Sequence, residues 1–146
     1  MQDLRYCLTL VSTMLTGYFN ASSKLEQFLS TYNDVFDEEE EINSRIQKNF
    51  RLIESLSFDK KSRVWNKADF FTLFIELDKQ YVSKDISPDI VKLERILKSF
   101  YSSLEGKIDS DKLEEAQAKY HHAAIQGSSS RSRRIERAEV IRTIIT

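Results

Sequence analysis

Apolar side chains recur at every third or fourth position along most of the chain, which is the spacing of one face of an α-helix. Only three glycines and one proline interrupt the pattern, fewer breaks than a fold of many β-turns needs. We therefore predict six or seven helices, over about residues 3–16, 23–32, 37–56, 66–81, 88–105, 110–125 and 131–145. The pair Asn33-Asp34 either ends the second of these helices or lies within a longer one.

Residues that start or stop helices fall at the ends of these segments. Asn66 is a typical N-cap, and Asp69 lies three residues later, where an acid can return a hydrogen bond to the cap. The other expected starts are Ser22 or Ser23, Pro88, and Asp109 or Ser110, and the expected stops are Gly17 and Gly106.

The segment 66–81 is the most hydrophobic part of the chain. It carries two apolar stripes rather than one, which indicates burial on more than one side. The first stripe holds Phe70, Phe74, Leu77 and Tyr81, and the second holds Phe71 and Ile75. We therefore expect this helix at the centre of the fold, with Phe74 in the core.

The composition suits one all-α, bundle-like domain over residues 1–146, with a flexible connector near residues 126–130, where the sequence reads Gln-Gly-Ser-Ser-Ser. Net charge is −1, so any contact with nucleic acid must come from a local patch. A single cysteine fits a reducing compartment, and no apolar run is long enough to cross a membrane. These features predict a cytoplasmic protein without membrane contact.

The sequence contains no phosphate-binding glycine-rich loop and no Cys/His metal spacing, so we predict no cofactor and no metal. The acidic block at residues 37–41 could hold a metal or dock a basic partner. We favour a helix N-terminus, where carboxylates meet the positive end of the helix dipole.

The adjacent histidines His121 and His122 are the one candidate catalytic pair in the sequence. Adjacent residues on a helix point about 100° apart, so the two rings do not easily chelate one ion. Helical RNases of the HEPN class carry an arginine four to six residues before a histidine, and residues 114–117 contain none. We therefore predict no catalytic role for either histidine.

Five arginines and two glutamates give the last segment a local charge of +3. Arg131, Arg133, Arg134 and Arg137 are the candidate nucleic-acid contacts, on a helix face that we expect to stay free while the isoleucine face docks on the domain. The alternative is a solvated face with Glu-Arg pairs, or ion pairs to Glu38–Glu41. We favour the alternative, because nucleic-acid arms usually carry more charge and less apolar surface.

Four stretches together resemble the helical C-terminal portion of a large bacterial family. They read MQDLRYCLTLVSTML, KLEQFLSTYND, NKADFFTLFIELDK and YHHAAIQGSSSRSRRIERAEVI. The family is the ParB/sulfiredoxin-like group that includes the GmrSD-type restriction proteins, whose N-terminal domain carries an Asp-Gly-Gln-Gln-Arg motif. That motif is absent from this sequence, so the resemblance assigns no catalytic residue here.

The resemblance implies a non-catalytic helical domain of a larger DNA-linked defence or nuclease-type protein. Such a domain would pack on or position a ParB/sulfiredoxin-like domain, in the same or another chain, with weak contact to DNA phosphates. The alternatives are a free-standing helical adaptor for another protein and, less favoured, a small helical RNase or toxin-type enzyme. For this chain alone we favour a function other than catalysis.

Overall fold

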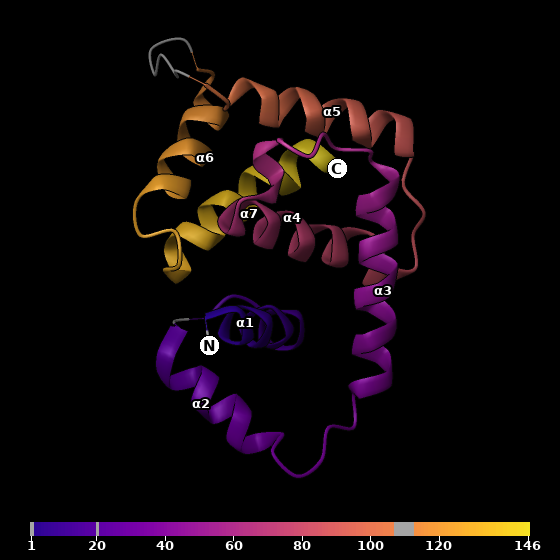
Figure 1. The fold of residues 1–146 in the computed structure, drawn as a ribbon, viewed down its shortest axis with the longest axis vertical. Coiled ribbons are helices and arrows are strands. Elements are labelled where there is room, and N and C mark those ends of the chain that lie inside the picture. The colour runs from indigo at the N-terminus through magenta and orange to yellow at the C-terminus, as the bar shows by residue number, and fades with distance from the viewer. Residues whose placement is uncertain (1, 20, 107–112) are drawn as a thin grey trace.

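The computed structural model describes residues 2–19, 21–106 and 113–146, and these residues form helices and no strand. The all-α prediction is therefore confirmed (Figure 1). The α-helices are α1 (Gln2–Thr16), α2 (Ala21–Thr31), α3 (Glu39–Ser55), α4 (Lys67–Gln80), α5 (Ile90–Ser103), α6 (Glu115–Ile125) and α7 (Arg131–Ile145), and two 3-10 helices are η1 (Arg63–Trp65) and η2 (Val82–Lys84).

Helix α4 lies at the centre of the arrangement (Figure 1). It packs against α1, α3 and α7, and α7 in turn packs against α5 and α6. Helix α2 packs on α1, at the end of the molecule away from α5 and α6. Because α4 and α7 are covered on more than one side, polar residues on either helix become buried among their neighbours.

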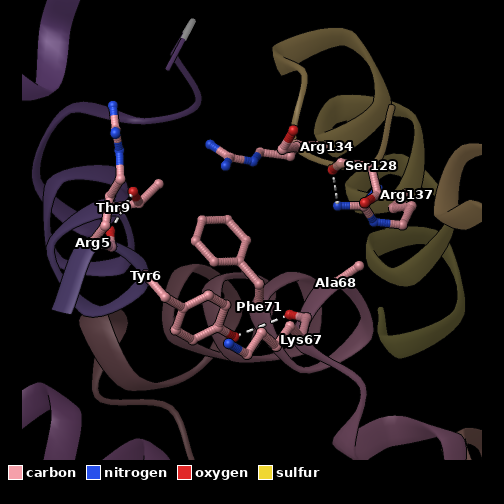
Figure 2. Close-up of a pocket in the computed structure, with 10 residues that line it drawn as sticks. Arg5, Tyr6, Thr9, Lys67, Ala68, Phe71, Ser128, Arg134 and Arg137 are labelled. Carbon is pink, nitrogen blue, oxygen red and sulfur yellow. Dashed lines mark hydrogen bonds between the residues drawn. The ribbon is translucent and has the colours of Figure 1, made fainter. Parts of the chain in front are cut away.

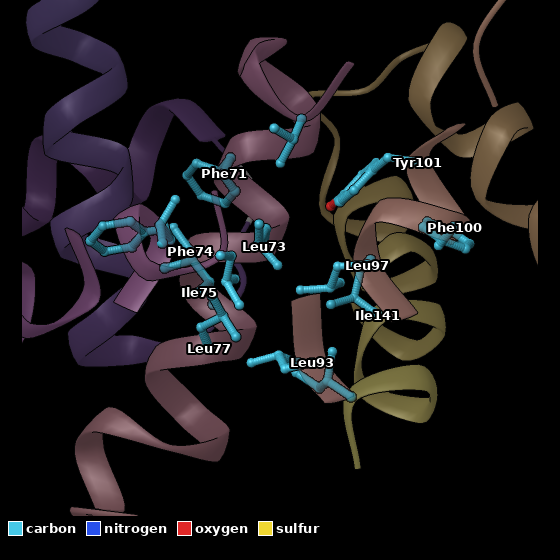
Figure 3. Close-up of a cluster of buried hydrophobic side chains, with 14 of the residues drawn as sticks. Phe71, Leu73, Phe74, Ile75, Leu77, Leu93, Leu97, Phe100, Tyr101 and Ile141 are labelled. Atoms are coloured by element: carbon cyan, nitrogen blue, oxygen red, sulfur yellow. The ribbon is translucent and has the colours of Figure 1, made fainter. Parts of the chain in front are cut away.

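The core forms where α4 meets α5 and α7 (Figure 3). Leu73, Phe74, Ile75 and Leu77 are all fully buried, which confirms the predicted central position of this helix and of Phe74. They pack in one cluster with leucines of α5, including Leu97, and with residues of α7. Burying such side chains stabilises the fold by about 1.5–3 kcal/mol each relative to leaving them exposed.

Several predicted helix ends are also confirmed. Gly17 has φ +80° and donates its N–H to Thr13 O at 2.9 Å, a left-handed stop that glycine adopts without strain. Helix α7 begins at Arg131 as expected, and Ser130 caps it by accepting the N–H of Arg133. The acidic block supplies the first turn of α3 with carboxylates, as the dipole favours.

Other predicted helix starts differ from the structure. Asn66 is the N-cap of α4, but its side chain makes no capping hydrogen bond, and Asp69 bonds elsewhere. Helix α5 begins after Pro88, because the side chain of Asp89 caps it by accepting the N–H of Lys92. The proposed caps Ser22 and Ser23 lie inside α2, and Asp109 and Ser110 lie outside the described residues.

The second helix ends at Thr31, so the pair Asn33-Asp34 follows a helix rather than lying within one. None of the described helices combines the length and the apolar character needed to cross a bilayer.

Candidate functional site

Three carboxylates of α4 are buried, and each meets an arginine from another element. Asp69 Oδ2 accepts from Arg63 Nε of η1 at 3.0 Å, and Glu76 Oε2 accepts from Arg142 Nε of α7 at 3.0 Å. Asp78 Oδ1 accepts from Arg45 Nε of α3 at 3.1 Å, with a second contact between the same two groups. The central helix is therefore tied to three neighbours by compensated ion pairs.

Further hydrogen bonds complete these pairs. The Tyr120 hydroxyl donates to Asp69 Oδ1 at 2.8 Å, and the Tyr18 hydroxyl donates to Glu76 Oε1 at 2.9 Å. Asn49 Nδ2 donates to Asp78 Oδ1 at 3.1 Å. Buried carboxylates are tolerated when they are both paired and hydrogen-bonded, as all three are here.

The four candidate nucleic-acid contacts do not share one free face. Arg131 is exposed and donates to Tyr18 O at 3.0 Å, and Arg133 pairs with Glu136 at 2.7 Å. Arg134 and Arg137 are only 8% and 1% exposed. The expectation of a free arginine face is therefore wrong for Arg134 and Arg137, because α7 is packed on several sides.

The ion pairs of this helix also differ from those expected. The predicted alternative paired its arginines with glutamates of the same helix or with Glu38–Glu41. Arg133 does pair with Glu136 across one turn, but Arg142 pairs with the buried Glu76 of α4 instead of the acidic block. Glu41 pairs with Arg45 of its own helix at 3.2 Å.

The buried guanidinium of Arg137 is held by neutral oxygens. Its nitrogens donate to Thr72 Oγ1 at 3.0 Å, Ala123 O at 2.7 Å and Ser128 O at 2.9 Å. These bonds fix the group between α4, α6 and the loop before α7. Burial lowers the pKa of Arg137, although nearby acidic groups act in the opposite direction.

Arg134 lies almost one turn before Arg137 on α7, and its surroundings are sparser. Its guanidinium carbon lies 4.8 Å from the centre of the Phe71 ring, a cation–π contact. One of its terminal nitrogens, Nη1, is buried without a hydrogen-bond partner. Burial lowers the pKa of Arg134, and the positive charge of Arg137 lowers it further.

A cavity of about 420 Å³ lies beside Arg134, between α1, the start of α4 and α7 (Figure 2). Its lining consists of Arg5, Tyr6, Thr9, Lys67, Ala68, Phe71, Ser128, Ser129, Arg134 and Arg137. In Figure 2 the side chain of Arg134 extends into the space between Arg5 and Phe71. Four of the lining residues are cationic, and no described carboxylate lines the cavity.

The aromatic floor of this cavity is held in place by α1 and α4. The Tyr6 hydroxyl donates to Lys67 O at 3.0 Å, and the Tyr6 and Phe71 rings meet edge to face at 5.9 Å. Burial raises the pKa of Tyr6 to about 12. At the rim, Lys67 Nζ lies 2.8 Å from Asp3 Oδ1, and both side chains are exposed.

The two histidines lie apart from this cavity. His121 is half-buried, with Nδ1 3.5 Å from Arg63 Nη1, and His122 is exposed. Because arginine only donates, Nδ1 of His121 is the acceptor in this contact. Burial lowers the pKa of His121, and the charge of Arg63 adds to the effect.

A second surface feature is a row of stacked aromatic rings, which we call the aromatic row: Phe50 of α3, Phe70 of α4 and Trp65 of η1. Phe70 stacks on Phe50 at 6.4 Å and on Trp65 at 6.0 Å. Phe50 and Trp65 are 47% and 45% exposed, while the buried Phe74 supports the row from below. The row is therefore an apolar surface on a rigid base.

Sequence reasoning missed the three buried acids of α4 and the cationic cavity. Asp69 and Glu76 lie seven residues apart in a helix predicted to be buried on two sides. Acids at such positions need cationic partners, so this spacing was a usable signal for the ion pairs. The cavity left no comparable signal, because its cations come from segments far apart in the chain.

Among the described residues, no group of three or more His, Cys, Asp or Glu side chains is arranged to hold a metal ion. No protein-family model matches the chain, and searches of curated proteins and solved structures find no significant similarity. The resemblance to the ParB/sulfiredoxin-like family therefore stays a prediction.

Proposed function

We propose that this chain is a helical interaction domain that docks on a partner protein through the aromatic row. The observation that carries the proposal is the exposure of Phe50 and Trp65, close to half of each side chain, on both sides of Phe70. Large aromatic side chains are enriched at protein interfaces, where they bury much area at little cost in conformational entropy.

The row is also preorganised for docking. Trp65 Nε1 donates to Asp59 O at 2.8 Å, which fixes the indole ring. Phe50 and Phe70 both rest on Phe74 in the core, at 5.5 and 5.8 Å between ring centres. A partner therefore does not need to order these side chains when it binds, which lowers the entropic cost of association.

The partner that we propose is a ParB/sulfiredoxin-like domain of a DNA-linked defence or nuclease-type protein, in the same or another chain. This choice rests on the sequence resemblance alone. In the alternative, a free-standing adaptor, the same row would dock on an unrelated protein.

Trp65 is the only tryptophan in the chain, so it reports directly on the row. A tryptophan-free ParB/sulfiredoxin-like domain titrated into the protein should shift the Trp65 emission to the blue and protect it from acrylamide. Phe50→Ser should weaken binding about tenfold or more, because central aromatic anchors commonly carry that much affinity.

Val91→Ser is the matched control, since Val91 is 78% exposed on α5, outside the row. It should bind as the wild type does. A saturated complex in which Trp65 stays open to acrylamide, or Phe50→Ser binding with unchanged affinity, would refute docking through this row. Binding by an unrelated protein with the same Trp65 response would favour the adaptor.

A further inference from the structure

The cavity between α1, α4 and α7 gathers four cations, and among the described residues only Lys67 meets a carboxylate, that of the exposed Asp3 at the rim. Arg5, Lys67, Arg134 and Arg137 line it, and the described residues place no carboxylate in the lining (Figure 2). By contrast, the arginines that pair with α4 elsewhere in the fold each end on one of its buried carboxylates. Arg134 and Arg137 are the two buried cations of this lining, and no described carboxylate pairs with either. Burying a cation without a paired acid is costly, and an anion bound in the cavity would offset that cost.

The surroundings of Arg134 also indicate an anion site. It is more than nine-tenths buried, one terminal nitrogen has no hydrogen-bond partner, and its side chain extends into the cavity. Arg137 behind it is locked by three neutral acceptors. The site is thus built from a fixed cation and a neighbouring guanidinium with unused donor capacity.

We propose that this cavity binds the phosphate group of a small phosphate monoester that carries an apolar or aromatic group. The planar guanidinium of Arg134 can donate two parallel hydrogen bonds to phosphate oxygens. Arg5 and Lys67 also line the cavity and add positive charge. Ser128 and Ser129 bring hydroxyl donors from the loop before α7.

The size and the floor of the cavity define the rest of the ligand. A volume of about 420 Å³ is in the range of sites for small organic molecules and exceeds what a lone phosphate fills. Tyr6 and Phe71 present apolar ring surface beside the cations. The phosphate therefore lies toward Arg134, and the organic group lies on the two rings.

Duplex DNA fits this site less well. A phosphate of a duplex stays on the outer surface of a rigid rod, whereas Arg134 and Arg137 are buried. The arginines of α7 that a duplex could reach more easily are the exposed Arg131 and Arg142 and the half-buried Arg133. This inference is independent of the aromatic row and of its partner.

The test is isothermal titration calorimetry of the whole chain in chloride buffer of constant ionic strength. The probes are inorganic phosphate, phenyl phosphate, phenol and a short DNA duplex. Phenyl phosphate should bind about tenfold or more tightly than inorganic phosphate, and phenol should show no binding. Arg134→Met should weaken the binding of phenyl phosphate about tenfold or more.

Arg5→Met serves as a second variant, because Arg5 is exposed and its loss leaves the core intact. This variant should bind phenyl phosphate severalfold more weakly than the wild type does. Arg133→Met is the matched control on the same helix, outside the cavity lining, and should titrate as the wild type does. Equal affinity of the wild type and both cavity variants, or no heat with phenyl phosphate, would overturn the proposal. Tighter, Arg134-dependent binding of the duplex would replace the small molecule with nucleic acid.

Discussion

Arg45 and Arg134 are both largely buried, yet their surroundings differ in charge. Arg45 meets the buried Asp78 of α4, and Asn49 completes the hydrogen bonds of that carboxylate. Arg134 meets the face of Phe71 and the positive charge of Arg137, and one of its nitrogens has no partner. Arg45 therefore stabilises the fold, whereas Arg134 can still donate a hydrogen bond to a ligand.

Removing a carboxylate from one of the buried ion pairs should have the largest effect on stability. Asp69→Ala leaves Arg63 without its carboxylate and the buried Tyr120 hydroxyl without its acceptor. We expect a loss of about 3–5 kcal/mol in the free energy of unfolding, as for other buried pairs that lose one partner. Urea denaturation followed by circular dichroism measures this change.

Asp3→Ala is the control for that experiment, because the Asp3–Lys67 pair is exposed. Its removal should leave the free energy of unfolding nearly unchanged, because ion pairs between exposed side chains contribute little to stability. If Asp69→Ala lowers the free energy of unfolding no more than Asp3→Ala does, the buried pairs do not hold α4 to its neighbours.

The ionisation of Tyr6, on the floor of the cavity, should cause a smaller and pH-dependent change in stability. Because burial raises the pKa of Tyr6 to about 12, the folded protein keeps this proton after the unfolded chain, with a pKa near 10, has lost it. The stability that Tyr6 contributes is therefore complete below pH 10 and is lost as pH rises through about 12. Other buried tyrosines act in the same direction.

Tyr6→Phe isolates the share of this one group. In a spectrophotometric titration at alkaline pH, the difference between wild type and Tyr6→Phe should show one phenol ionising near pH 12. A phenol that ionises near its ordinary pKa of about 10 in the folded protein would place Tyr6 in solvent and leave the cavity without its aromatic floor.

The sequence predicted the helices better than their contacts. The bounds 131–145 match α7 at both ends, because the Gly-Ser loop and the Ser130 cap act locally. The two stripes of 66–81 placed Phe74 in the core. These features depend on residues within one or two turns of each other, which a single sequence displays directly.

The contacts of the site residues involve partners far away in the chain, and the sequence alone did not predict these contacts. Asp69 matches a capping box in spacing, but it bonds to Arg63 and to Tyr120 of α6 instead. Arg134 and Arg137 look like a solvated face until α7 is packed against α4 and α6. The cavity joins α1, α4 and α7, and no local spacing connects these three segments.

The most direct test compares Arg45→Met with Arg134→Met by urea denaturation in buffer free of phosphate. Methionine keeps apolar contacts at both positions, so the variants differ mainly in the charge that each leaves behind. Arg45→Met should lose about 3–5 kcal/mol, since it strands the buried Asp78. Arg134→Met should lose nothing measurable or become more stable, because no described carboxylate depends on it. An equal loss in both variants would contradict the distinction between a compensated framework arginine and an uncompensated one at a ligand site.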